Sequence, residues 1–237
     1  MDLKFLGRGS AYNYKEGNTS AYFIDNNELF LIDCGEDVFQ KLLKKRILEN
    51  KNIIHVLITH THSDHVGSLG SLILYSHYVL KQKVNIIISE NKNQKIEIER
   101  VLKCFGIEES IYNFRFTKDY ENKYNLFTNI NYIKTEHTPL LNCFSIIFDT
   151  DEGIIFYSGD SSEVSLLQVL LKGNKKIAKM YIDVCNDKNN IVHMYLEEIN
   201  KIIPENIKDK IYGMHFNNMT CIEETLNYNF NIVKIDE

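Results

Sequence analysis

Residues 60–65 read HTHSDH and directly follow the apolar run IIHVLI, so three of the chain's eight histidines stand within six positions. Side chains alternate along an extended chain, which predicts that His60 and His62 share one side and that Asp64 and His65 follow in a turn. Imidazole and carboxylate groups are ligands for Zn²⁺, Mn²⁺ or Fe²⁺. The segment therefore predicts a metal site where a strand ends.

Composition limits the other classes of function. The chain has 237 residues, 44% of them hydrophobic, and a net charge of −5, which does not favour nucleic-acid backbones or anionic membranes. We find no repeat or linker and expect one domain over residues 1–237. We also expect no signal peptide and no membrane span. Five scattered cysteines without a CxxC pair are typical of the reducing cytoplasm, and Cys185 follows a strand expected to end near the site.

Hydrophobic periodicity predicts an alternation of strands and helices. Strands are expected at 2–6, 20–25, 28–33, 53–59, 84–89, 114–118, 130–136, 143–150, 153–159, 179–184, 210–214 and 230–235. Helices are expected at 36–49, 68–81, 91–106, 163–173 and 195–204. Two strand-rich halves, each followed by helices, predict two packed sheets with helices outside. The basic run of helix 36–49 is expected to be a solvated face.

Three further metal-ligand types stand at expected strand ends. His137 follows strand 130–136, Asp160 lies in SGDSS after strand 153–159, and His215 follows strand 210–214. Each has an alternative explanation when taken alone, either as a packed histidine or, for Asp160, as a helix N-cap. Together with residues 60–65 they favour a site large enough for two ions. His55 lies inside a buried strand, and we expect it to be structural.

HTHSDH resembles the HxHxDH signature of the metallo-β-lactamase superfamily. FLGRGSAYN, GNTSAYFI and LIDCGE are similar to the N-terminal motifs of its ribonuclease Z-like branch, and His137, SGD at 158–160 and MHF at 214–216 follow in the order of the later motifs. The resemblance covers nearly the whole chain. It implies an α/β fold, the metallo-β-lactamase αββα sandwich, with the metals at one edge of the two sheets.

The resemblance also implies how the ligands divide between two divalent ions, with Zn²⁺ expected and Mn²⁺ the alternative. The first ion is assigned to His60, His62 and His137, the second to Asp64, His65 and His215, and Asp160 bridges them. Asp33 is expected to support this shell through a hydrogen bond. Two such ions imply metal-assisted hydrolysis, in which Asp64 orients the attacking water.

A proton donor is implied in the same way. His193 stands just before helix 195–204, where ribonuclease Z-like phosphodiesterases carry a histidine that protonates the leaving alkoxide, and Asp183 resembles its acidic partner. Cleavage of a phosphodiester with an alkoxide leaving group needs such an acid. The alternative is that His193 is an exposed residue at the start of a helix.

Two features bear on the substrate. The interval between His137 and Asp160 holds only the two expected strands 143–150 and 153–159, whereas ribonucleases Z carry a long tRNA-binding arm there, so we do not expect tRNA to be the substrate. Aromatic and cationic side chains could stack a base and neutralise a phosphate, or simply pack. The candidates are Arg8, Tyr12, Tyr14 and Tyr75.

A compact core without the arm resembles small-substrate phosphodiesterases, among them bacterial and phage enzymes that destroy the cyclic mononucleotide signals of Pycsar immunity. We therefore expect hydrolysis of 3′,5′-cyclic nucleotides to 5′-monophosphates. The alternatives are a ribonuclease acting on RNA 3′ ends and a lactonase or thioesterase of the same fold. Homodimerisation is an expectation from the family.

Overall fold

The computed structural model describes residues 1–236. The first half of the chain forms a six-stranded sheet in the order β1-β2-β3-β4-β5-β6. Its strands are β1 (Lys4–Gly7), β2 (Ser20–Asp25), β3 (Glu28–Ile32), β4 (Ile54–Leu57), β5 (Val84–Ile88) and β6 (Tyr112–Phe116). β1 to β3 pair antiparallel and β3 to β6 pair parallel. The fully buried β4 and β5 have the continuous apolar character of central parallel strands.

The second half repeats this plan in a sheet of order β12-β11-β10-β9-β8-β7. Its strands are β7 (Asn129–Thr135), β8 (Cys143–Thr150), β9 (Gly153–Tyr157), β10 (Ile177–Asp183), β11 (Ile211–Met214) and β12 (Asn231–Ile232). β7 to β9 pair antiparallel and β9 to β12 pair parallel. Each half thus supplies parallel strands whose carboxyl ends can carry a site.

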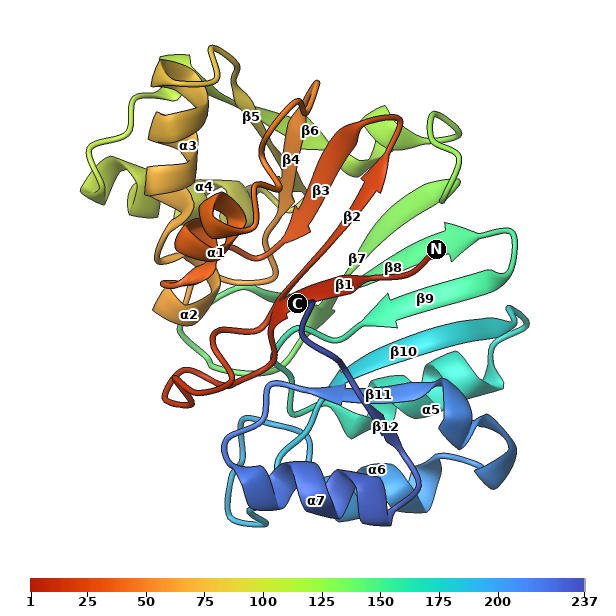
Figure 1. Ribbon diagram of the computed structural model, residues 1–237. Coiled ribbons are helices and arrows are strands. Elements are labelled where there is room, and N and C mark those ends of the chain that lie inside the picture. Colours follow the sequence, from red (N-terminus) through yellow and green to blue (C-terminus); the bar gives the residue numbers. More distant parts are fainter. Residues whose placement is uncertain (237) are drawn as a thin grey trace.

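Helices cover the outer face of each sheet, so the layers run helix, sheet, sheet, helix as predicted (Figure 1). The first sheet carries α1 (Val38–Lys44), α2 (Ser63–Val66), α3 (Leu69–Tyr78) and α4 (Lys92–Cys104). The second carries α5 (Val164–Lys172), α6 (Leu196–Ile202) and α7 (Met219–Asn227). Short 3₁₀ helices cover Glu109–Ile111, Thr117–Tyr120 and Glu205–Lys210.

An aromatic-rich core lies between the two sheets. Phe23 and Phe30 stack with ring centroids 4.8 Å apart, and Phe148 from the second sheet meets Phe23 edge-on at 5.6 Å. Full burial of one such side chain contributes roughly 1.5–3 kcal/mol. This core fixes the position of one sheet against the other and, with it, the edge where their loops meet.

Several elements differ from the sequence prediction, among them α1, α7 and β12. α1 ends at Lys44 instead of continuing to residue 49, because the chain turns there and Arg46 takes a positive φ of 58°. α7 was not predicted, although the side chain of its N-cap Asn218 accepts a hydrogen bond from the Cys221 amide at 2.9 Å. β12 is shorter than expected. No helix within residues 1–236 is long and apolar enough to cross a membrane.

Candidate metal centre

The predicted ligands gather where parallel strands of both sheets end. Asp33 follows β3, His60 lies shortly after β4, Asp183 closes β10 and His215 follows β11. Carboxyl ends of parallel strands meet at the same edge of a sheet, and ligand sites of α/β folds lie there. The strand order therefore explains why residues far apart in sequence meet.

The backbone takes unusual conformations at this edge. Asp33 and His215 both have φ of 60°, and Gly159, just before Asp160, has φ of 58°. The left-handed region costs a residue other than glycine roughly 1–2 kcal/mol. At Gly159 a side chain would also meet the Phe144 carbonyl oxygen at 2.8 Å. Such strain at functional sites persists where the surrounding structure holds it, and here it turns polar side chains toward one another.

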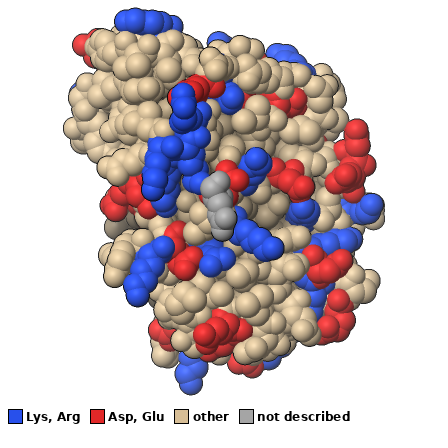
Figure 2. Space-filling model, viewed as in Figure 1, with Lys and Arg blue, Asp and Glu red and all other residues tan. Residues whose placement is uncertain are grey.

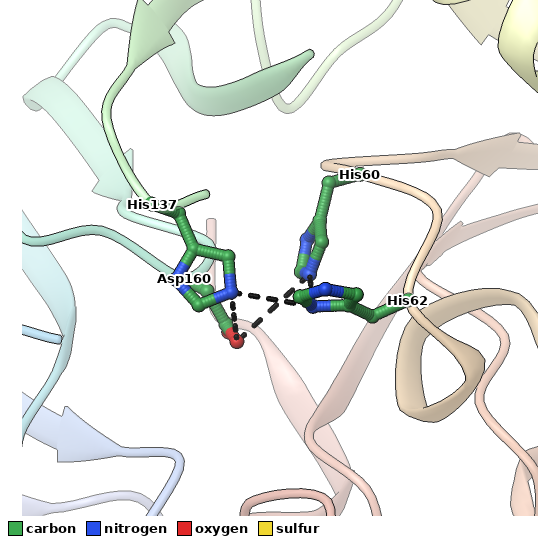
Figure 3. Close-up of side chains that lie close together, drawn as sticks. All are labelled: His60, His62, His137 and Asp160. Carbon is green, nitrogen blue, oxygen red and sulfur yellow. Dashed lines mark hydrogen bonds and ion pairs between the residues drawn. The ribbon is translucent and has the colours of Figure 1, made fainter. Parts of the chain in front are cut away.

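The first ligand group comprises His60, His62, His137 and Asp160 (Figure 3). His62 Nδ1 lies 2.9 Å from His60 Nε2 and 3.2 Å from His137 Nε2. Asp160 Oδ2 lies 3.6 Å from His137 Nε2 and 3.9 Å from His60 Nε2. Three ring nitrogens and a carboxylate oxygen thus converge, which is a ligand set that suits a divalent transition metal.

The second group comprises Asp64, His65, Asp160 and His215. Asp64 Oδ2 lies 3.4 Å from His65 Nε2 and 3.3 Å from His215 Nε2. Asp160 reaches the same two nitrogens at 3.2 and 3.3 Å. Asp160 is therefore common to both groups, in the bridging position that the sequence resemblance implied.

His65 tests whether this site suits a cation. Its Nδ1 donates to Asp33 Oδ2 at 2.8 Å, which leaves a lone pair on Nε2. Within residues 1–236, Nε2 is buried and has no hydrogen-bond partner. Buried polar atoms are nearly always paired, so an unpaired nitrogen that faces two carboxylates fits a divalent cation.

Carboxylates dominate the electrostatics of the two histidines in the second group. Burial alone would lower the pKa of His215, but Asp160, Asp183 and Asp64 outweigh it and raise the pKa to about 10. At His65 burial is likewise overcome by the nearby carboxylates, which raise the pKa well above its usual value. The field that favours a proton on these rings also favours a cation beside them.

His193 and Asp183 meet as the sequence predicted. His193 Nδ1 donates to Asp183 Oδ2 at 2.6 Å, and Asp183 Oδ1 lies 3.4 Å from His215 Nδ1. Burial opposes protonation of His193, but the charge and hydrogen bond of Asp183 prevail and raise its pKa. The His193 ring lies 5.0 Å from that of His137 and 5.1 Å from that of His215. It therefore stands beside both ligand groups.

His193 and five of the seven proposed ligands line a cavity of about 480 Å³, a size typical of small-ligand sites. Besides metal ligands and His193, its lining includes Tyr12, Glu36, Cys185, Asn190 and Asn217. Tyr12 is 95% exposed and lies on the wall, as expected, whereas Tyr14 is exposed elsewhere. The position expected for Cys185, near the site, is confirmed.

Besides Tyr14, two more of the expected substrate contacts lie away from the cavity and need correction. The Arg8 guanidinium bonds Glu16 at 2.6 Å and the Val233 carbonyl at 2.9 Å, so its charge is neutralised away from the cavity. Tyr75 lies on α3 and packs against Phe39 with centroids 5.6 Å apart. The helical periodicity turns Tyr75 toward the core of the first sheet, and neither residue lines the cavity.

Three supporting groups were missed from the sequence. Thr59 donates to both oxygens of Asp33, from its amide at 2.8 Å and its hydroxyl at 2.7 Å. The Val192 carbonyl accepts from His137 Nδ1 at 2.7 Å. Asn190 accepts two backbone hydrogen bonds in the same loop. Only Asn190 had a sequence signal, since asparagine shortly before a functional residue in a turn often bonds the backbone ahead of it.

Both the sequence and the fold of this chain are similar to those of known proteins. The chain is 28% identical over 231 residues to the anti-Pycsar protein Apyc1 of Bacillus phage BSP38, covering 90% of this chain and 88% of that one. Its fold is similar to the metallo-β-lactamase fold protein YhfI of Bacillus subtilis, with a TM-score of 0.71, 16% identity and coverage of 95% and 90%. It is also similar to the short form of human tRNase Z, with a TM-score of 0.63, 20% identity and coverage of 93% and 94%.

The fold is therefore the predicted metallo-β-lactamase αββα sandwich. The sequence family described as anti-Pycsar protein Apyc1 matches residues 1–234, almost the full length. The chain belongs to the anti-Pycsar protein Apyc1 family.

Proposed function

We propose that this protein is a phosphodiesterase with two divalent metal ions that opens 3′,5′-cyclic nucleotides to 5′-monophosphates. The observation that carries the proposal is the 2.6 Å hydrogen bond between His193 and Asp183, placed beside both ligand groups. A phosphodiester with an alkoxide leaving group needs a proton donor in addition to metal ligands. The relatives described as anti-Pycsar proteins support a nucleotide signal as the substrate.

The chemistry assigns one task to each group. Water oxygen bonds to phosphorus while the bond from phosphorus to the 3′ oxygen breaks, and that oxygen takes a proton. Two divalent ions, Zn²⁺ in this proposal and Mn²⁺ as the alternative, supply positive charge to the phosphate and acidify water when bound. Asp64 orients the water, and Asp183 holds His193 with its Nε2 proton available for the 3′ oxygen.

Surface charge and loop length support a small substrate over tRNA. Basic and acidic side chains are intermixed over the face in Figure 2, with one basic cluster near α1. In that region Lys41 pairs with Asp37 and Arg46 with Glu49, each at 2.7 Å. The interval from His137 to Asp160 is filled by the β8–β9 hairpin. Binding of tRNA depends on many unpaired cations, so a mononucleotide fits better.

The proposal includes a homodimer working in the cytoplasm. The five cysteines are all free, which suits a reducing compartment. Light scattering coupled to gel filtration measures the mass in solution, and a monomer at the working concentration would remove the dimer from the proposal.

The function is tested with a substrate panel. Protein purified with its metals is incubated with four 3′,5′-cyclic mononucleotides, several cyclic dinucleotides, a tRNA precursor and an acyl-homoserine lactone. His193→Ala is the test variant, and His77→Ala, on α3 away from the cavity, is its matched control. We expect turnover of cyclic mononucleotides to fall about 10²-fold or more in the test variant only.

The other outcomes identify the alternatives. Cleavage of the tRNA precursor alone would place the protein among RNA 3′-end nucleases. Turnover of the lactone alone, unchanged by His193→Ala, would make it a lactonase and leave His193 as a residue at the start of a helix.

A further inference from the structure

The loop between β10 and α6 is closed at its base and free at its tip. The Cys185 amide donates to the Met194 carbonyl and the Leu196 amide to the Cys185 carbonyl, each at 2.9 Å. At the tip, Ile191 is 83% exposed. The apolar side chain at the tip is thus not buried, so the conformation between the closed ends depends on polar contacts within the loop.

Asn190 provides three of those contacts. Its Oδ1 accepts hydrogen bonds from the amides of Val192 at 3.0 Å and His193 at 3.2 Å. The backbone amide of Asn190 donates to the Asp187 carbonyl at 3.0 Å. Side-chain bonds of this kind turn the chain without a regular element. Because two N–H groups face it, the side-chain atom in this position must be the oxygen.

The two residues that Asn190 holds act on two different parts of the site. The Val192 carbonyl accepts from His137 Nδ1 at 2.7 Å, which leaves His137 Nε2 to face the first ligand group. His193 bonds Asp183 through its own Nδ1. The rings of His137 and His193 lie 5.0 Å apart. One asparagine oxygen thus bonds both the residue behind a proposed metal ligand and the proposed proton donor itself.

We propose that Asn190 is a positioning residue that couples the metal ligand His137 to the proton donor His193. The His193 part of this inference rests on the proposed function, whereas the His137 part concerns metal retention and needs no substrate. Loss of the Asn190 oxygen leaves the amides of Val192 and His193 without their partner, so both the carbonyl behind His137 and the ring of His193 lose their fixed positions.

Metal retention is measured first, by the rate at which a chromophoric chelator removes the ions from Asn190→Ala, Asn190→Asp and the wild type. Aspartate keeps the acceptor oxygen, so it should restore retention. We expect Asn190→Ala to release one of its two ions about 10-fold faster, as for other residues that orient metal ligands. Asn189→Ala is the matched control, because within residues 1–236 the Asn189 side chain bonds only Asp187.

Turnover separates positioning from a general weakening of the fold. Cleavage of a cyclic mononucleotide needs a proton for its alkoxide, whereas bis(p-nitrophenyl) phosphate releases a stable anion. In Asn190→Ala we expect kcat to fall about 10–100-fold for the cyclic nucleotide and clearly less for the aryl ester. In Asn190→Asp kcat should recover, while KM rises because the added negative charge repels phosphate.

The results are decisive in either direction. Wild-type metal retention and kcat in Asn190→Ala would overturn the inference. Equal losses on both substrates without rescue by aspartate would also overturn it, since Asn190 would then only stabilise the loop. If the wild type cleaves no cyclic nucleotide, the proposed function fails, and the chelator measurement alone decides whether Asn190 holds His137.

Discussion

β4 carries a buried histidine near its start and the histidine cluster just after its end, and these two regions differ in how the rings are bonded. His55 Nδ1 bonds the Tyr120 hydroxyl and its Nε2 bonds Glu28, both at 2.8 Å. His65 bonds Asp33 through Nδ1, while its Nε2 has no hydrogen-bond partner among residues 1–236. The two rings are about equally buried, so the unpaired second nitrogen, and not burial, distinguishes the candidate ligand His65 from the structural His55.

The charges around His55 and His65 differ as well. Burial lowers the pKa of His55, because it outweighs the single carboxylate of Glu28. Around His65, Asp160, Asp64 and Asp33 together outweigh burial and raise the pKa. A cluster of carboxylates around an unpaired nitrogen therefore distinguishes the candidate metal site after the end of β4 from the structural histidine near its start.

The largest expected effect comes from removing the bridging carboxylate. Asp160→Ala takes an oxygen from both ligand groups, so both ions should be lost. We expect kcat/KM to fall by about 10³-fold or more, equivalent to about 4 kcal/mol of transition-state stabilisation. Metal analysis and a kinetic assay check this, and a variant that retains both ions would refute the bridging role.

His62→Ala should separate the two groups. His62 belongs only to the first group, so we expect one ion per chain to remain at the second. Activity should fall by about 10²-fold or more, equivalent to about 2.7 kcal/mol. Elemental analysis of the purified variant gives the stoichiometry. Loss of both ions would show that the groups bind cooperatively and not independently.

Asp33→Asn tests whether the hydrogen bond from His65 to Asp33 strengthens metal binding. The amide can still occupy the place beside His65 Nδ1, but it lacks the negative charge that strengthens this hydrogen bond. Metal affinity should fall about 10–100-fold, as for comparable residues behind metal-binding histidines. Titration with a competing chelator measures it. An unchanged affinity would mean that Thr59 and burial suffice to hold the ring.

His55→Ala should affect stability and leave the metals in place. The substitution opens a cavity and leaves Tyr120 without its partner at Nδ1. We expect a loss of about 2–4 kcal/mol in the free energy of unfolding. Urea denaturation measures this loss, and metal analysis serves as the control. A change in metal content would show that the two ends of β4 are coupled.

The smallest expected effect is on pH dependence. An unfolded chain protonates His55 near its ordinary pKa of about 6.5, whereas the folded chain does so only at lower pH. As pH falls from about 6.5 toward the folded pKa, the unfolded state binds more protons and stability decreases. His55→Ala lacks this pH-dependent contribution. The difference in free energy of unfolding between the variant and the wild type should therefore become smaller as pH falls. Urea unfolding curves of both proteins between pH 7.5 and pH 5 measure this difference.

Much of the fold was predictable because its strands and most of its helices have regular periodicity. The segment CFSIIFDT matches β8 residue for residue, and SAYFID matches β2. α7 was missed because its capping Asn218 lies in a short loop only three residues after the proposed metal ligand His215. The length of α1 was overestimated because the turn at Arg46 depends on backbone conformation and not on hydrophobic pattern.

For the site, many side chains at strand ends were predictable, whereas contacts made by the backbone of loops were not. The geometry brings together all seven proposed ligands with Asp33, Asp183 and His193. Arg8 and Tyr75 were misplaced because residue type alone does not say which way a side chain points. The Val192 carbonyl was beyond prediction, since every residue has one and only the folded loop shows which of them reaches His137.

The division of the ligands between the two sheets has a consequence for the newly made chain. His60, His62, Asp64 and His65 extend from the first sheet, while His137, Asp160 and His215 extend from the second. Synthesis proceeds from the N-terminus, so the signature residues emerge long before their partners. In the proposed assignment, neither half contains a complete ligand set for either ion. The proposed activity would therefore begin only when residue 215 has left the ribosome and the two sheets have docked.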